Sequence, residues 1–98
     1  MIYISAPISG YDLKERKAYF ARIARQLEIQ GNIVFNPMAD IDILNPPPYE
    51  LCMKTDINAL TRCNKILLCG DWPKPRGCRL EYEVARTCGL EIAVLVEQ

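Results

Sequence analysis

Histidine is absent from the sequence, and its five cysteines include no Cys-x-x-Cys pair. Cys-His and Ser-His-Asp catalysis are therefore excluded, and the ligand spacing typical of a zinc site is missing. An odd number of unpaired cysteines predicts five reduced thiols that pack as small residues, in a reducing compartment such as the cytoplasm. No apolar run approaches the ~20 residues that a membrane-spanning helix needs, so we expect no membrane partner.

Net charge is also lacking, since twelve Lys and Arg balance twelve Asp and Glu. The chain has no overall positive field to hold a nucleic-acid backbone, so a small-molecule partner is predicted in place of DNA or RNA. Met1 leads directly into an apolar Ile-Tyr-Ile run, which predicts a strand and not a signal peptide. The length predicts a single domain over residues 1–98. A domain this small gains from association, and we expect a homodimer or a larger homo-oligomer.

Hydrophobic patterning predicts alternating strands and helices. Strands are expected at 2–5, 33–35, 65–69 and 91–96, and helices at 13–30, 49–62 and 78–88. The residues expected to face inward from the last helix are Leu80, Val84, Ala85 and Cys88. The strands are apolar along most of their length, which is typical of a sheet covered on both faces. Right-handed crossovers then give an α/β fold, a three-layer doubly wound sandwich with a four-stranded parallel sheet.

Sheets of this kind bind ligands beyond the carboxyl ends of their strands. Those ends are at 5–10, 36–40 and 70–77, where many of the turn-forming and polar residues gather. We therefore predict a ligand pocket at this edge. The residues expected to contact the substrate are Ser5, Pro7, Ile8, Gly10, Asn36, Gly70, Trp72, Arg76 and Gly77.

Glu81 is the strongest candidate for a reactive residue. It lies four residues after Gly77, in the expected opening turn of the last helix, where the helix dipole favours a charged carboxylate. We therefore expect Glu81 to stay ionised at neutral pH and to be able to attack the anomeric carbon of a sugar. On spacing alone, the alternative is a plain acidic residue that completes a helix N-terminus.

Asp56 is the second candidate, because it lies on or beside the apolar stripe of the middle helix, where a carboxylate needs a partner or a purpose. The alternative is a salt bridge or a hydrogen bond to a loop. If Asp56 faces Glu81, one carboxylate would attack while the other assists proton transfer. Tyr3 and Ser5 point the same way from the first strand, so Tyr3 either holds Glu81 by a hydrogen bond or belongs to the core.

Three further features have two interpretations each. Lys74, Arg76 and Arg79 form a cationic cluster that either binds an anionic substrate or is a solvated loop face. Trp72 either stacks on a base or covers the edge of the core. Cys78 lies in the same functional loop, where it either reacts or packs.

Several stretches of sequence carry a resemblance to a known family. They are IYISAPISG at 2–10, NP at 36–37, YELCMKTDINAL at 49–60, CNKILL at 63–68, GDW at 70–72 and GCRLE at 77–81. Together they resemble the nucleoside 2-deoxyribosyltransferase superfamily, and most closely a short branch found in bacterial and phage genomes. The resemblance spans nearly the whole chain, and its most specific part is the separation of the Asp56 segment from 77–81.

The resemblance implies a flavodoxin-like fold and cleavage of the N-glycosidic bond of a nucleoside or nucleoside monophosphate, without a metal or other cofactor. Glu81 is similar to the glutamate that attacks C1′ of a deoxyribose. Asp56 is similar to the aspartate that assists departure of the base, and Tyr3 to the tyrosine that positions the glutamate. Water as the acceptor gives hydrolysis and a second base gives transfer, by double displacement with retention.

Alternatives to this function stay open. Asn64 and Pro75 stand where members of the superfamily often have an aspartate or a phosphate-binding serine, and the sequence ends at Gln98, just after the last predicted strand. We therefore expect hydrolysis of a nucleotide, or a catalytically inactive nucleotide-binding or sensing module, in preference to base transfer. A third hypothesis is an interaction protein whose loop at 72–73 meets a macromolecular partner.

Overall fold

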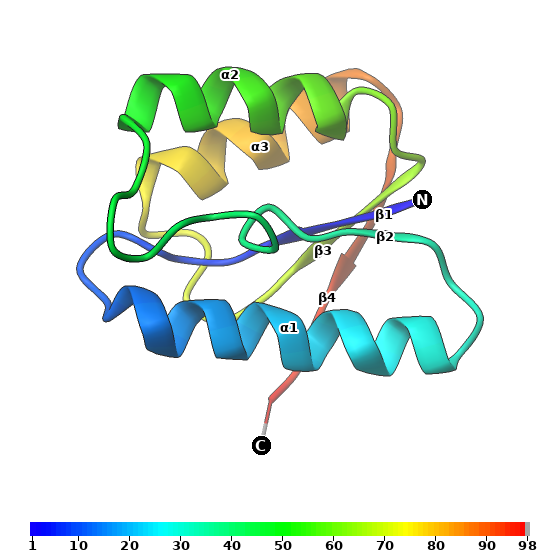
Figure 1. Cartoon of the computed structure of the whole chain (residues 1–98). Coiled ribbons are helices and arrows are strands. Elements are labelled where there is room, and N and C mark those ends of the chain that lie inside the picture. The colour runs from blue at the N-terminus through cyan, green and yellow to red at the C-terminus, as the bar shows by residue number, and fades with distance from the viewer. Residues whose placement is uncertain (98) are drawn as a thin grey trace.

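The computed structural model describes residues 1–97, so Gln98 lies outside it. The strands are β1 (Ile2–Ser5), β2 (Val34–Phe35), β3 (Lys65–Leu68) and β4 (Glu91–Val94). The helices are α1 (Leu13–Ile29), α2 (Tyr49–Leu60) and α3 (Arg76–Thr87). The strands form one all-parallel sheet in the order β2-β1-β3-β4. Helix α1 covers one face of the sheet, while α2 and α3 cover the other (Figure 1). The predicted α/β fold, a flavodoxin-like three-layer sandwich, is confirmed.

Helix α1 shows how local sequence sets these elements. The Asp12 side chain caps its N-terminus by accepting a hydrogen bond from the backbone N–H of Glu15 at 3.0 Å, a contact that stabilises a helix by about 1 kcal/mol. The apolar stripe of α1, including Phe20 and Ile23, is buried in the core on this face of the sheet. Just beyond the helix end, Gly31 has a φ of 92°, a left-handed conformation that glycine adopts without strain.

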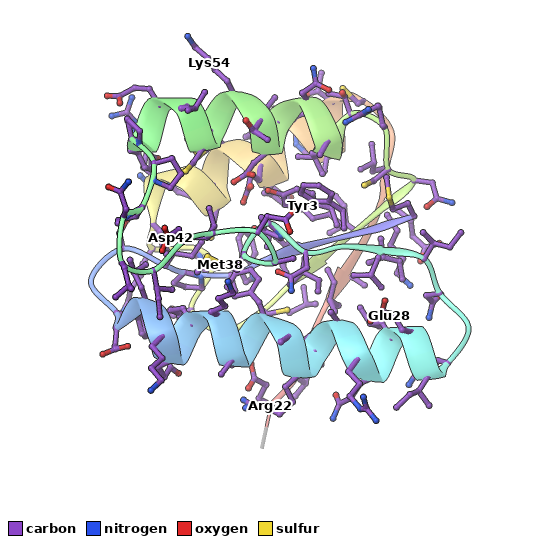
Figure 2. All side chains as sticks on the ribbon, in the orientation of Figure 1. Tyr3, Arg22, Glu28, Met38, Asp42 and Lys54 are labelled. Atoms are coloured by element: carbon purple, nitrogen blue, oxygen red, sulfur yellow. The ribbon has the colours of Figure 1, made fainter. Side chains whose placement is uncertain are left out.

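Successive residues of β1 point to opposite faces of the sheet. Ile2 and Ile4 belong to the core beneath α1, whereas Tyr3 belongs to the core beneath α2 and α3. The Tyr3 ring stacks on Phe35 with the ring centroids 5.5 Å apart. Figure 2 shows Tyr3 in the layer between the sheet and these two helices, while Lys54 and Arg22 point away from the body of the molecule. The polar ends of Tyr3 and Ser5 are thereby placed on the face that α3 covers.

Helix α3 begins earlier than predicted, at Arg76, because Pro75 takes the N-cap position with an extended backbone. The buried residues of α3 are Cys78, Glu81 and Ala85, at helical spacings of three and four. Leu80 is 48% exposed and Cys88 is also exposed, so the prediction that they face inward is wrong. The inward stripe of α3 therefore includes an acidic residue in place of Leu80.

The edge strand β4 ends at Val94, two residues before the predicted end, and most of its residues are exposed. This edge of the sheet is therefore less covered than the apolar pattern predicted. The five cysteines are free thiols, three of them buried: Cys63, Cys69 and Cys78. In the part of the chain that is described, no helix is long and apolar enough to cross a membrane.

Candidate functional site

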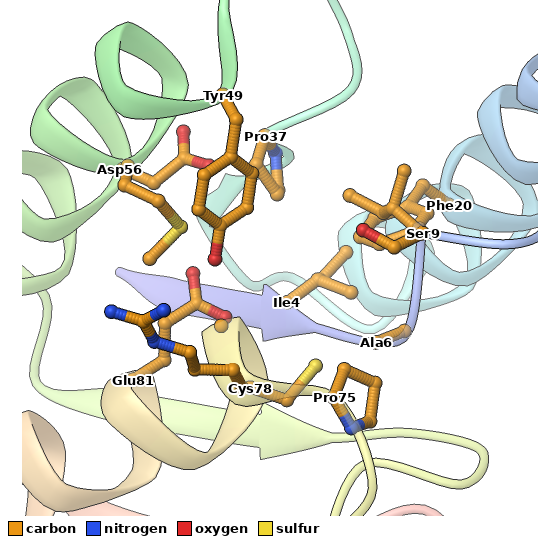
Figure 3. Close-up of a pocket in the computed structure, with 14 residues that line it drawn as sticks. Ile4, Ala6, Ser9, Phe20, Pro37, Tyr49, Asp56, Pro75, Cys78 and Glu81 are labelled. Carbon is orange, nitrogen blue, oxygen red and sulfur yellow. The ribbon is translucent and has the colours of Figure 1, made fainter.

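A cavity of about 280 Å³ opens where the carboxyl end of β1 meets the N-termini of α2 and α3 (Figure 3). The first loop supplies Ala6, Ile8 and Ser9 to its wall, and α2 supplies Tyr49, Met53 and Asp56. The start of α3 supplies residues 75–78 and Glu81. The cavity thus lies at the sheet edge where the sequence predicted a ligand pocket.

Glu81 is buried at this cavity, with 7% of its surface exposed. Its carboxylate accepts a hydrogen bond on one oxygen from the Tyr3 phenol, and on the other from the Ser5 hydroxyl at 2.8 Å. Both donors come from β1, because residues two apart on a strand face the same side. Of the two roles that the sequence left open for Tyr3, the hydrogen bond to Glu81 is present, and Tyr3 also belongs to the core. These contacts fix the carboxylate from two sides.

The protonation of Glu81 differs from the expectation. Burial is the main cause that raises the pKa of Glu81 to about 7. The hydrogen bonds from Tyr3 and Ser5 act against this rise, and the nearby charge of Asp56 adds to it. The prediction that the helix dipole keeps Glu81 ionised was wrong, because α3 begins at Arg76 and Glu81 lies in its second turn, facing the core. At neutral pH the carboxyl group is therefore poised between its two states.

Tyr3 keeps its proton throughout this range. Its side chain is completely buried, and burial followed by the charge of Glu81 raises the pKa of the phenol far above its usual value. Tyr3 is therefore a permanent hydrogen-bond donor to Glu81.

Asp56 lines the same cavity from the α2 side, across from Glu81 on α3 (Figure 3). Partial burial raises the pKa of Asp56 to about 6. Within residues 1–97, none of the ion pairs involves Asp56, and its carboxylate accepts no side-chain or loop hydrogen bond. The salt-bridge alternative is therefore not what the structure contains. Two carboxyl groups with raised pKa values share one cavity, an arrangement suited to acid–base or nucleophilic chemistry.

Some predicted substrate contacts do lie at the cavity. Ile8, Arg76 and Gly77 line it, and Ser5 reaches it through Glu81. Asn36 lines an adjoining cavity of about 250 Å³ that also reaches Asp56. Its side-chain oxygen accepts a hydrogen bond from the backbone of Met38 at 2.9 Å, so Asn36 also fixes its own turn.

Other predicted contacts do not line this cavity: Pro7, Gly10, Gly70 and Trp72. Gly70 has a φ of 62° and lies against Pro7, because a Cβ added at position 70 would be 3.6 Å from the proline ring. These two residues therefore pack the loop after β1 against the loop after β3. Gly10 has a φ of 85° and turns the first loop. Trp72 packs on Tyr82 of α3 with the ring centroids 5.1 Å apart, which favours its role at the core edge.

The three residues of the cationic cluster, Lys74, Arg76 and Arg79, also differ in whether they reach the cavity. Lys74 forms an ion pair with Asp71 at 2.9 Å, and Arg79 donates hydrogen bonds to the carbonyl groups of Pro73 and Lys74. These two cations stabilise the loop before α3. Arg76 alone of the three lines the cavity, so it is the member of the cluster able to meet an anionic ligand.

Sequence reasoning missed two residues of α2 that form part of the wall, Tyr49 and Met53. Their signal was present, because Tyr49, Met53 and Asp56 are spaced by four and three residues and so share one helical face. Cys78 also lines the cavity, and burial raises the pKa of its thiol to about 11. A thiol that stays protonated is a poor nucleophile, so packing is the role that the structure favours for Cys78. Across the described residues, no three potential metal-ligating side chains gather into a group.

Comparison with known families gives a match to the family described as a domain of unknown function, DUF4406, over residues 1–94. The chain belongs to the DUF4406 family. No match to a curated protein was found. The matched range contains every residue that lines the cavity, so the site is built within the DUF4406 domain itself.

Proposed function

We propose that this DUF4406 protein cleaves the N-glycosidic bond of a nucleoside or nucleoside monophosphate, with Glu81 as the nucleophile. The observation that carries the proposal is the buried Glu81 carboxylate, held by Tyr3 and Ser5 in a cavity that it shares with Asp56. The resemblance to nucleoside 2-deoxyribosyltransferases falls on the same residues. We place the reaction in the cytoplasm, where the free thiols would stay reduced.

The reaction would proceed in two displacements. The ionised Glu81 attacks C1′ of the sugar, and the base leaves with the electron pair of the glycosidic bond while Asp56 supplies its proton. The sugar is then joined to Glu81 as an ester. Water, deprotonated by the Asp56 carboxylate, attacks C1′ and releases Glu81, so the anomeric configuration is retained and the proton returns to Asp56.

The raised pKa values set how often the pair is ready for this exchange. The reactive form of the pair carries one proton, placed on Asp56, while Glu81 is ionised. Because Glu81 has the higher pKa, the proton lies mainly on Glu81, and the reactive form is the minor one, roughly one-tenth of the singly protonated pairs. With pKa values of about 6 for Asp56 and about 7 for Glu81, the pair holds a single proton mainly between these values. We therefore expect a bell-shaped dependence of turnover on pH, with its maximum between about 6 and 7.

The second candidate is a nucleotide-binding module without turnover, for which Pro75 is the motivating residue. Pro75 lines the cavity and lacks the side-chain oxygen that a serine or aspartate would offer to a substrate. Asn64 carries less weight, because its side chain accepts a hydrogen bond from the N-terminal ammonium group of Met1 at 2.9 Å, and it does not line the cavity. An interaction role for Trp72 is disfavoured because its ring packs on Tyr82.

The deciding experiment is incubation with a panel of nucleosides and their 5′-monophosphates, followed by chromatography for released base. Glu81→Gln should abolish release while the circular dichroism spectrum stays that of the folded protein. Glu83→Gln is the matched control, because Glu83 is on the same helix but pairs with Arg86 at the surface. Tight binding of a nucleotide without release during long incubation would favour the second candidate. Equal release by the wild type and Glu81→Gln would refute the proposed nucleophile.

A further inference from the structure

Tyr49 overhangs the cavity from the first residue of α2, directly after three prolines. It lines both the Glu81 cavity and an adjoining apolar cavity of about 210 Å³ that runs along Pro46 and Pro47. Figure 3 shows the Tyr49 ring descending from α2 with its hydroxyl directed into the cavity, toward the Glu81 side. Tyr49 is thus one of the residues that line both cavities.

The Tyr49 hydroxyl is free to bind a ligand. The buried phenols of Tyr3 and Tyr19 each donate to a carboxylate, Glu81 and Glu97 respectively. By contrast, the phenol of Tyr49 forms no hydrogen bond with any of residues 1–97, and the side chain is half-exposed. The Tyr49 hydroxyl, which can both donate and accept a hydrogen bond, therefore faces the cavity without a partner among these residues.

Gly77, on α3, is the residue that leaves room for this hydroxyl. A Cβ added at position 77 would lie 3.3 Å from the Tyr49 oxygen and 3.5 Å from the Met53 sulfur. The backbone of Gly77 does not require glycine, because the four glycines with positive φ are at other positions: Gly10, Gly31, Gly70 and Gly89. Alanine is the better helix former, so glycine in the first turn of α3 weakens the helix. The close approach of Tyr49 gives a physical reason for a glycine that the helix itself disfavours.

We propose that Tyr49 is a substrate-binding residue whose hydroxyl hydrogen-bonds the sugar of the nucleoside above Glu81, and that Gly77 provides the space this position needs. The identity of the substrate rests on the proposed function, whereas the fit of Tyr49 over Gly77 does not. The sugar is the partner that the geometry favours, because C1′ must lie next to Glu81 and the Tyr49 hydroxyl is directed toward the Glu81 side of the cavity (Figure 3). The wall on this side otherwise offers the thioether of Met53 and the hydrogen at Gly77, neither of which can hold a sugar hydroxyl strongly.

The test compares the wild type, Tyr49→Phe, Gly77→Ala and the double variant. KM and kcat are measured for base release, and the dissociation constant of the same nucleotide is measured by calorimetry for each chain in a Glu81→Gln background. Each single variant should weaken binding about fivefold to tenfold, the loss expected for one hydrogen bond. The double variant should be no weaker than Tyr49→Phe alone, because without the hydroxyl there is nothing left to displace. Tyr11→Phe is the matched control, since Tyr11 is a similarly exposed tyrosine, outside the cavity, that should leave binding unchanged.

Thermal unfolding without ligand tests the close fit of Tyr49 over Gly77 independently of any substrate. Gly77→Ala should raise Tm by about 3 °C in the Tyr49→Phe background, where the better helix former meets no hydroxyl. The same change should raise Tm less when Tyr49 is present. Equal gains in both backgrounds would contradict the fit of Tyr49 over Gly77.

The outcomes separate the two proposals. Base release by the wild type with unchanged binding in both single variants would overturn the role of Tyr49 and leave the glycosidase proposal standing. Nucleotide binding without base release, but with the expected loss in both variants, would overturn the glycosidase proposal and leave Tyr49 standing. If the wild type releases no base and no nucleoside or nucleotide binds in the Glu81→Gln background, both proposals fail.

Discussion

Tyr3 donates a hydrogen bond to Glu81 across 78 residues of sequence, from the central strand β1 to the helix that packs over it. Both side chains are buried, so the most reactive candidate of the site is also part of the core beneath α2 and α3. A buried carboxylate is costly unless it is hydrogen-bonded, and here β1 supplies two donors, Tyr3 and Ser5. Changes at this pair should therefore affect both turnover and stability, in ways that experiments can separate.

The first prediction concerns Tyr3→Phe, which removes the hydroxyl and keeps the ring that stacks on Phe35. Because the hydrogen bond from Tyr3 lowers the pKa of Glu81, its loss should raise that pKa further. Because Glu81 has the higher pKa of the pair, the basic limb of the rate profile should then move to higher pH, and kcat should fall by at least about tenfold. The measurement is base release across pH 5 to 9.

Tyr19→Phe is the control for this prediction. It removes another phenol that donates to a carboxylate, that of Glu97, and Tyr19 does not line the cavity. In the control variant, this limb of the rate profile should stay at its wild-type pH even if the protein loses stability. A limb that moves equally in both variants, or in neither, would show that Tyr3 does not set the pKa of Glu81.

The second prediction concerns stability as a function of pH. The pKa of Glu81 rises from 4.5 to about 7 on folding, so the folded state binds more protons than the unfolded state between these values. The free energy of unfolding should therefore fall as pH rises from about 4.5 to 7, by about 3 kcal/mol for this one group, and stay low above that range. Urea unfolding at pH 5 and at pH 8 measures this difference.

Glu81→Gln should remove the share of this pH dependence that Glu81 contributes, because an amide does not titrate. Asp56, whose pKa rises from 3.8 to about 6, should leave a residual slope of the same sign in the variant. A wild-type protein that is more stable at pH 8 than at pH 5 would contradict the raised pKa of Glu81, as would an unchanged slope in the variant.

The sequence predicted the order of elements and the sheet because apolar strands and amphipathic helices alternate clearly along it. It also predicted that Tyr3 and Ser5 face one way, since that follows from strand geometry alone. It did not predict the burial of Glu81. That depends on where α3 begins and which of its faces meets β1, and the N-cap at Pro75 shifted the start to Arg76.

Other site residues were also set by tertiary packing. The position of Trp72 in a loop predicted a contact with the substrate, but its ring packs on Tyr82. The spacing of Tyr49 and Met53 placed them on the helical face of Asp56, but they line the cavity because α2 lies beside α3. Local rules therefore located the cavity, whereas the contacts between helices decided which side chains line it.

The third prediction concerns Asp56→Asn. If Asp56 supplies the proton to the leaving base, its loss should lower turnover of an ordinary nucleoside or nucleotide by about 100-fold or more. A deoxyriboside with a nitrophenol leaving group needs no such proton, so release of nitrophenol in the first turnover should fall much less. Glu50→Gln is the matched control, because Glu50 is an exposed acidic residue in the first turn of the same helix. Equal losses in the first turnover of both substrates would exclude Asp56 as the acid.

The fourth prediction is that the chain associates as a homodimer or a larger homo-oligomer, measured by size exclusion with light scattering. Strand β4 lies at the edge of the sheet, where one side of its backbone has no neighbouring strand among residues 1–97. Ile92 and Val94 point to the same face and are 37% and 55% exposed. An exposed apolar edge strand is a favourable place for a second chain to pair. Val94→Lys should therefore shift the protein toward the monomer, whereas Leu44→Lys, at an exposed apolar loop residue, should not. A wild-type protein that is strictly monomeric at high concentration would defeat the prediction, and an oligomer unaffected by Val94→Lys would place the interface elsewhere.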